Sequence, residues 1–297
     1  MGTYKKLKTN YLIDMRLITI PLYTLIMFGI FACDKDDDST EKQTVENFIF
    51  EDGFETQDNS VNELFPSNGS RWSSIQQSDP TDATNEISIS DINFSEGRNA
   101  LRLLAFRSDN SLSKMDIEKN GFSAFKGDRV LIKADFFIGN TANIENLLLI
   151  DLECCSCWDP TANVENQCPG VRLKMSGGND FLSIERGKIA ESTIEQTSFP
   201  FPRNEWVNVQ WEMTLSDTDN GMNKVLINGT EVVNSSGTNM PNAQTFRAIF
   251  AQEGIDFTLQ EPAFYERVQI GATANPTAEN IELFIDNFSI VVEKNVP

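Results

Sequence analysis

Three side chains in the segment YERVQIG could move protons and bind an acid on one face of a strand. Successive side chains of a strand alternate between its two faces, so Tyr265, Arg267 and Gln269 should share a face opposite Val268 and Ile270. Removing the C5 proton of a uronate requires a base, an acid for the leaving oxygen and a group that neutralises the carboxylate. We therefore take Tyr265, Arg267 and Gln269 as candidate catalytic residues for such an elimination.

Other residues supply candidate sugar contacts. In the expected strand 171–176, alternation turns Arg172 and Lys174 away from the core, where they could line a positive groove. Trp158 lies in a cysteine-rich loop and Trp206 faces away from the core side of its strand, so either could stack on a sugar ring. The alternative for both sets is structural, with the cations on a solvated strand face and the tryptophans in the core.

The composition narrows the chemistry further. The chain of 297 residues contains no histidine and has a net charge of −20. Without histidine it can form neither a Ser-His-Asp nor a Cys-His catalytic arrangement, and no imidazole-ligated zinc site. We expect no nucleic-acid partner, because phosphate binding requires clustered Lys and Arg.

Four cysteines, Cys154, Cys155, Cys157 and Cys168, lie close together in the sequence. Outside the cytoplasm, an even number of closely spaced cysteines favours disulfides. Free thiols and a zinc site are the alternatives, although the spacing lacks the paired C-x-x-C knuckles of zinc sites. We expect two disulfides. The pairing stays open, except that adjacent Cys154 and Cys155 should not bond each other and at least one bridge should reach Cys168.

The N-terminal segment resembles a bacterial lipoprotein signal. An apolar run from Leu17 to Ala32 follows basic residues, ends at Cys33 and is short for a membrane span. The acidic run after Cys33 resembles the surface-export tether of lipoproteins from the Bacteroidota. We expect a signal peptide at 1–32, a lipid on Cys33, a flexible tether at 33–46 and an outer-membrane location facing the cell exterior. A plain signal peptide or an internal anchor is the alternative, and translation could start at Met15 instead of Met1.

Residues 47–297 predict a single all-β domain. Short alternating apolar runs are separated by Gly, Asn, Asp and Pro, and no helical window stands out. About a dozen strands are expected, a number that suits one β-sandwich without a linker-like break. The clearest expected strands are 99–107, 128–139, 146–155, 171–176, 181–187, 205–215, 223–228, 264–271 and 280–292.

One passage is more specific than this alternation. The segment EWVNVQWEMTLSDTDNGMNKVLINGTEVV predicts a long antiparallel hairpin with turns at 219–221 and 228–229. Together with the opening FEDGFE, the stretch SEGRNALRL and the closing IELFIDNFSI, it resembles the concanavalin A-like lectin and glucanase jelly rolls. Among these it is most similar to heparin-lyase-type polysaccharide lyases. The resemblance covers Phe48 to Glu293 and implies an antiparallel jelly-roll β-sandwich.

The resemblance also implies sites. Retaining glucanases of this superfamily place their acids on one strand as E-x-D-x-x-E, to which Asp151-Leu152-Glu153 is the nearest approach here. Many sugar-binding jelly rolls bring together an acid near the first strand and one near the last. Asp52 and Asp286 occupy such places, with Glu51 as a substitute for Asp52, and their oxygens suit a structural calcium ion. Two ordinary turn carboxylates are the alternative.

Function must come from sites, because this fold hosts enzymes, lectins and adhesion modules. We expect a cell-surface lipoprotein that binds polysaccharide and is attached to the membrane by its lipid. The alternatives are a polysaccharide lyase acting on a uronate-containing glycan and an adhesion lipoprotein without a sugar site. Convergence of Tyr265, Gln269, Arg172 and Lys174 in one groove would favour carbohydrate chemistry, and scatter would favour adhesion.

Overall fold

The computed structural model describes residues 46–108, 112–139, 144, 146–159, 161, 168–176, 178–187, 189, 194–274 and 279–295. The expected signal peptide, Cys33 and the tether up to residue 45 lie outside the described residues. Within the described ranges, no helix has both the length and the apolar character that a membrane crossing requires.

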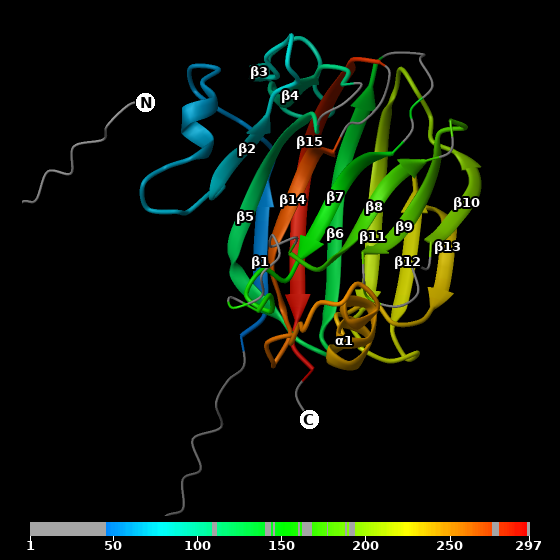
Figure 1. Ribbon diagram of the computed structural model, residues 1–297. Coiled ribbons are helices and arrows are strands. Elements are labelled where there is room, and N and C mark those ends of the chain that lie inside the picture. Colours follow the sequence, from blue (N-terminus) through cyan, green and yellow to red (C-terminus); the bar gives the residue numbers. More distant parts are fainter. Residues whose placement is uncertain are drawn as a thin grey trace, which may run out of the picture. The chain divides into compact units, whose positions relative to one another are not determined.

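In this part of the chain, two antiparallel sheets overlap face to face (Figure 1). The eight-stranded sheet has the order β13-β12-β11-β6-β15-β4-β3, with β1 added along β15. Its strands are β1 (Phe48–Asp52), β3 (Glu86–Ser90), β4 (Ala100–Ala105), β6 (Arg129–Ile138), β11 (Trp206–Thr214), β12 (Met222–Ile227), β13 (Thr230–Ser236) and β15 (Ile281–Glu293).

The seven-stranded sheet has the order β10-β9-β8-β7-β14-β5-β2 within the described residues. Its strands are β2 (Ser74–Ser78), β5 (Lys114–Ala124), β7 (Leu147–Glu153), β8 (Gly170–Ser176), β9 (Phe181–Gly187), β10 (Ile194–Pro200) and β14 (Tyr265–Ala274). Two stacked antiparallel sheets confirm the expected jelly-roll β-sandwich. Each strand range named from the sequence overlaps an observed strand.

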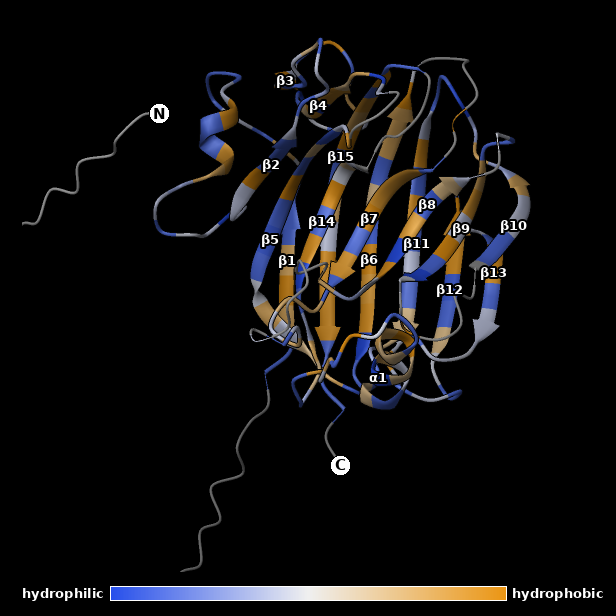
Figure 2. Ribbon diagram, viewed as in Figure 1, coloured by the Kyte–Doolittle hydropathy of each residue, from blue (hydrophilic) through white to orange (hydrophobic). Residues whose placement is uncertain are grey.

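The hydrophobic core lies between the two sheets. Along β6, the side chains of Val130, Ile132, Ala134, Phe136 and Ile138 are buried, as period-two alternation requires. Figure 2 shows the same alternation as orange and blue bands along many of the strands. Because the core takes one face of each sheet, the other face of each sheet is left for polar side chains.

The long hairpin is confirmed. Strand β11 pairs with β12 from Val209 opposite Ile227 to Thr214 opposite Met222. The chain then turns into β13 at Asn228 and Gly229, which have φ angles of 48° and 77°. Positive φ at two successive residues is the conformation that tight hairpin turns need, and Asn-Gly is the pair that tolerates it best.

The expectation of a chain without a clear helix is wrong at α1 (Ala243–Gln252). Asn242 begins this helix, because its side chain accepts hydrogen bonds from the backbone N–H groups of Gln244 and Thr245. Phe246 and Phe250, one turn apart, are both buried. Two buried aromatic residues are too few to show a helical period in the sequence, so the pattern of apolar residues did not predict α1. A 3-10 helix, η1, covers Val61–Leu64.

Strand β1 enters the fold beside the last strand. Phe48 lies opposite Val292 and Asp52 opposite Phe288. The backbone N–H of Lys294 donates a hydrogen bond of 3.0 Å to the side chain of Asn47. The start of β1 and the end of β15 therefore lie at the same end of the sandwich, and the loop that follows β1 lies at the other end (Figure 1).

Candidate functional site

The outer face of the seven-stranded sheet carries charged and amide side chains on its central strands. They alternate with the core residues of β5, β7, β8, β9 and β14. We call this set the polar face: Lys114, Asp116, Glu118, Asp151, Glu153, Arg172, Lys174, Glu185, Arg267 and Gln269.

Strand register brings residues that are far apart in sequence into one row of the polar face. Arg172 of β8 lies opposite Asp151 of β7. Asp151 lies opposite Gln269 of β14, and Gln269 lies opposite Glu118 of β5. The sequence-predicted residues Arg172, Lys174, Arg267 and Gln269 are thus on one face, as expected.

Two arginine side chains of the polar face are partly exposed, and buried carboxylates hold their guanidinium groups. Arg172 Nε donates to Asp151 Oδ2 at 2.8 Å, and the Arg172 side chain is 22% exposed. Arg267 Nε and one terminal nitrogen donate to Glu153 Oε2 at 2.7 and 2.5 Å, and the Arg267 side chain is 21% exposed. A second Arg267 nitrogen lies 3.3 Å from Glu118. These contacts fix both arginines in orientation, and the nearby Asp151 raises the pKa of Arg172.

Glu153 is a carboxyl group of the polar face whose pKa is raised toward neutrality. Burial, followed by the charge of Asp151, raises the pKa of Glu153 to about 7, although Arg267 acts in the opposite direction. A carboxyl group with this pKa can both accept and release a proton near neutral pH. Asp151 and Glu153 are also the two acids that come nearest to the acid strand of retaining glucanases in the sequence.

Some buried polar atoms of the polar face have no hydrogen-bond partner within the described residues. They are both carboxylate oxygens of Asp116, Oδ1 of Asp151 and Nε2 of Gln269. Lys114 Nζ lies 3.4 Å from Asp116 Oδ2 and donates to Gln269 Oε1 at 3.1 Å. Burial raises the pKa of Asp116 well above its usual value, with Lys114 opposing it.

Tyr265 does not share the face of Arg267 and Gln269, contrary to the expectation from alternation. Its side chain is fully buried in the hydrophobic core, and its hydroxyl donates to the carbonyl of Asn239 at 2.6 Å. The pairing of β14 with β5 shifts register between Tyr265 and Arg267, which interrupts the alternation at this point. Burial also raises the pKa of Tyr265 well above its usual value. The structure therefore does not place the Tyr265 phenol with Arg267 and Gln269 on the polar face.

The two tryptophans expected as sugar platforms are placed elsewhere. Trp158 is buried, with ring centroids 5.6 Å from Phe250 and 4.7 Å from Phe257, so it packs beneath α1. Trp206 is half-buried and contacts Phe137, with ring centroids 5.8 Å apart, on the eight-stranded sheet. Neither tryptophan therefore belongs to the polar face.

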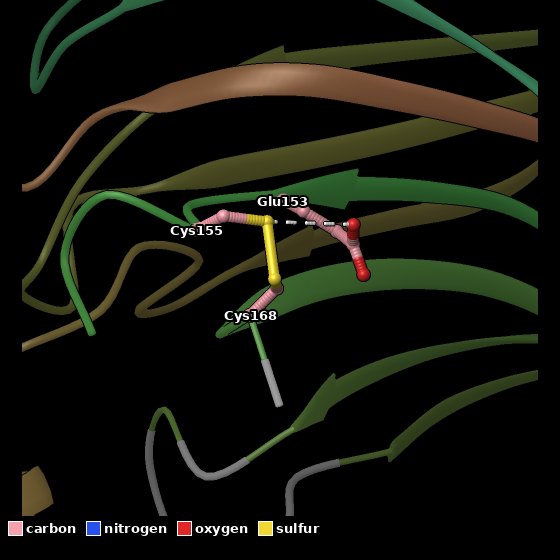
Figure 3. Close-up of side chains that lie close together, drawn as sticks. All are labelled: Glu153, Cys155 and Cys168. Carbon is pink, nitrogen blue, oxygen red and sulfur yellow. Dashed lines mark hydrogen bonds between the residues drawn. A yellow bond between two sulfur atoms is a disulfide. The ribbon is translucent and has the colours of Figure 1, made fainter. Parts of the chain in front are cut away.

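The cysteines form two disulfides, Cys154–Cys157 and Cys155–Cys168, which confirms the expected number and the bridge to Cys168. Glu153 Oε2 lies 3.9 Å from Cys155 Sγ, next to the second bridge (Figure 3). These three residues are near enough together for metal ligation. However, sulfur atoms joined in a disulfide are not thiolates, and Glu153 is paired with Arg267, so the zinc alternative does not fit.

Asp52 and Asp286 do not fit the calcium site expected from the resemblance. Both oxygens of Asp52 accept hydrogen bonds from Arg71, at 2.5 and 2.8 Å. Asp286 Oδ2 accepts from the backbone N–H groups of Ser95 and Glu96, at 2.9 and 3.1 Å. These carboxylates are already used by protein donors, so we derive no calcium site from them.

The sequence analysis did not predict that β5 contributes residues to the polar face. Asp116 and Glu118 lie on the polar face, and Lys114 joins them. The signal was present in the segment KMDIE, where charged and apolar residues alternate strictly.

Comparisons with known proteins bear on the fold alone. No protein-family model matches the chain, and no curated protein matches it in sequence. The structure is similar to that of an endo-β-1,4-glucuronan lyase from the fungus Trichoderma reesei, with a TM-score of 0.53 and 10% identity, covering 74% of this chain and 90% of the lyase. It is also similar to the cellulose-induced protein Cip1, with a TM-score of 0.52 and 11% identity over 81% and 96% of the two chains. The chain therefore has the jelly-roll β-sandwich fold that these two proteins share.

Proposed function

We propose that the protein is a cell-surface lipoprotein that binds polysaccharide along its polar face. The observation that carries this proposal is the pair of partly exposed arginine side chains, Arg172 and Arg267, each fixed by a buried carboxylate. Fixed donors lose little conformational freedom when they bind the hydroxyl or carboxylate oxygens of a sugar. The resemblance in fold to a glucuronan lyase is consistent with this class of ligand.

The spacing of the two arginines favours a chain over a single sugar. Arg267 pairs with Glu153, which lies opposite Gly170, two residues from Arg172. With neighbouring strands about 4.8 Å apart and about 3.4 Å per residue, the two α-carbons lie roughly 12 Å apart. Both guanidinium groups pair with carboxylates of β7, the strand between them, so an extended ligand that crosses β7 could contact both. Because acids and bases nearly balance on the polar face, the ligand need not be strongly charged.

Affinity electrophoresis in gels that contain neutral and acidic polysaccharides tests this proposal. Arg172→Gln should weaken retention by at least one glycan, since it removes a fixed donor and leaves Asp151 without its partner. Arg129→Gln is the matched control, because Arg129 pairs with Glu293 on the eight-stranded sheet. Equal retention of Arg172→Gln and the wild type, or no retention by any glycan, would contradict the proposal and favour an adhesion role.

Glu153 favours a second candidate, a polysaccharide lyase. Its pKa of about 7 would let the carboxylate accept the C5 proton of a uronate, while Arg267 lies beside it as a cation for the uronate carboxyl group. The C4–O bond would break as the C4–C5 double bond forms, and the leaving oxygen would take a proton from solvent water. A lyase produces an unsaturated uronate that absorbs ultraviolet light. Rising absorbance with an acidic polysaccharide, lost in Glu153→Gln and retained in Tyr265→Phe, would establish turnover. Retention without a rise in absorbance would establish binding alone.

A further inference from the structure

We infer that a hollow between residues 56–59 and residues 91–99 is a second sugar-binding site, specific for a pyranose that carries a negative group. We call this hollow the loop pocket. It lies between the loop that follows β1 and the loop that joins β3 to β4, and its volume is about 320 Å³. This volume is at the lower end of the range for small-molecule sites, and it suits a short ligand.

The loop pocket presents an aromatic ring and an unused cation. Phe94 lines it and is 37% exposed, with no aromatic ring beside it among the described residues. Arg98 also lines it and is exposed, and its guanidinium has no hydrogen-bond or ion-pair partner in the described part of the chain. An aromatic face binds the apolar face of a sugar, and a guanidinium binds a carboxylate or sulfate through two parallel hydrogen bonds.

The floor of the loop pocket contains a polar atom without a partner. Thr56 lines the pocket, is only 6% exposed, and its hydroxyl has no hydrogen-bond partner within the described residues. A buried polar group without a partner is costly, so this hydroxyl is a weak point of the packing beneath the pocket. The side chain of Gln57, exposed at the rim, adds an amide that can both donate and accept.

The walls of the loop pocket are held in place before any ligand binds. Glu55 Oε1 accepts hydrogen bonds from the backbone N–H groups of Arg98 and Asn99, at 2.7 and 3.2 Å. Asn99 donates to Asn59 at 3.0 Å, and Asn59 donates to Asp91 at 3.0 Å. These bonds join the two loops, so binding need not order them.

The same bonds explain why the ligand should be anionic. Among the residues that line the pocket, the acid is Asp91, and one of its oxygens is already used by Asn59. Arg98 is the cation of this lining, and among the described residues it forms no ion pair with Asp91 or with another acid, so it is the group that can bind a negative ligand. The carboxylate of a uronate and the sulfate ester of a sulfated sugar would engage Arg98 in the same way. None of the residues of the polar face enters this argument, so the inference does not rest on the proposed function.

Isothermal titration calorimetry on the full-length protein in detergent tests the inference. The probes are a tetragalacturonate, a sulfated carrageenan tetrasaccharide and the neutral cellotetraose. Phe94→Ala and Arg98→Gln should each weaken binding of one anionic probe about tenfold or more, because each removes a principal contact. Arg98→Lys should retain part of the affinity, since it keeps the charge and loses the two-fold geometry.

Two controls separate the pocket from general surface effects. Ile92→Ala removes an exposed apolar side chain of the same loop, and Arg107→Gln removes an exposed arginine beyond β4, and neither residue lines the pocket. Both variants should bind within about twofold of the wild type. Thermal melting of each variant shows that it is folded.

The outcomes divide clearly. The inference is overturned if Arg98→Gln binds the anionic probes as tightly as the wild type, if cellotetraose binds equally well, or if no probe binds. Which anionic probe binds identifies the source of the negative group. A loss in Arg98→Gln with no effect of Arg172→Gln would support the loop pocket and contradict binding at the polar face, and the reverse pattern would do the opposite.

Discussion

Asp116 offers a direct test of the electrostatics of the polar face. We expect Asp116→Asn to be more stable than the wild type at about pH 8 and nearly equal to it at about pH 4. Asp116 is fully buried, and neither of its oxygens has a hydrogen-bond partner among the described residues. Its pKa in the folded protein is raised well above 3.8, chiefly by burial. The folded state therefore binds a proton more tightly than the unfolded state. The free energy of unfolding of the wild type falls as the pH rises from about 4 to about 8.

The size of the effect follows from the contacts. A buried polar group without a partner costs about 1–3 kcal/mol, and the ion pair with Lys114 at 3.4 Å offsets part of this cost. Lys114 keeps a partner in the variant, because it also donates to Gln269. We expect a gain of about 1–2 kcal/mol at alkaline pH, or a rise in Tm of about 2–8 °C. Thermal melting monitored by circular dichroism across the pH range measures it.

A matched substitution provides the control. Asp128 is also buried, but its oxygens accept hydrogen bonds from the backbone of Phe125 and Asn295 and from Lys294 Nζ, at 2.9, 3.0 and 2.9 Å. Asp128→Asn should therefore lower the Tm, where Asp116→Asn raises it. If Asp116→Asn lowers the Tm at about pH 8, or raises it equally at about pH 4, the account of a buried charge that Lys114 compensates only in part is wrong.

Other substitutions test the anchor, the disulfides and the core tyrosine. Cys33→Ser should abolish incorporation of a labelled fatty acid, and equal labelling of variant and wild type would reject the lipid anchor. Changing Cys155 and Cys168 to Ser should lower the free energy of unfolding by about 3 kcal/mol, because the bridge joins residues 13 apart; an unchanged denaturation midpoint would contradict this. Tyr265→Phe should cost about 1 kcal/mol by removing the hydrogen bond to Asn239, with glycan retention unchanged, and a loss of retention would return Tyr265 to the site.

The sheet architecture could be predicted because alternation is a local property. A strand such as β6 buries every second residue, and this period is visible without knowing its neighbours. The same rule placed Arg172 and Lys174 correctly. It failed at Tyr265, because the register shift between Tyr265 and Arg267 depends on how β14 pairs with β5, which no single strand reveals.

The aromatic residues show a different limit. Trp158 was expected at the surface because it lies in a loop rich in cysteine, but Phe250 of α1 and Phe257 cover it. Predicting its burial required knowing that α1 exists and where it docks. The loop pocket was also out of reach, since Thr56 and Phe94 are brought together by long-range hydrogen bonds between two loops.

If the protein is the surface lipoprotein proposed above, the pairing of β1 with β15 bears on which parts of the domain face away from the membrane. A lipid on Cys33 would be joined to the domain through the tether expected at 33–46. That tether would span at most about 50 Å if it were fully extended. The tether would meet the domain at the end of the sandwich where β1 starts. The loop that follows β1 contributes to the loop pocket at the opposite end of the sandwich. With the tether extended, the loop pocket would therefore face away from the membrane. The polar face would then stand along the side of the domain, open to long glycans that lie parallel to its flank.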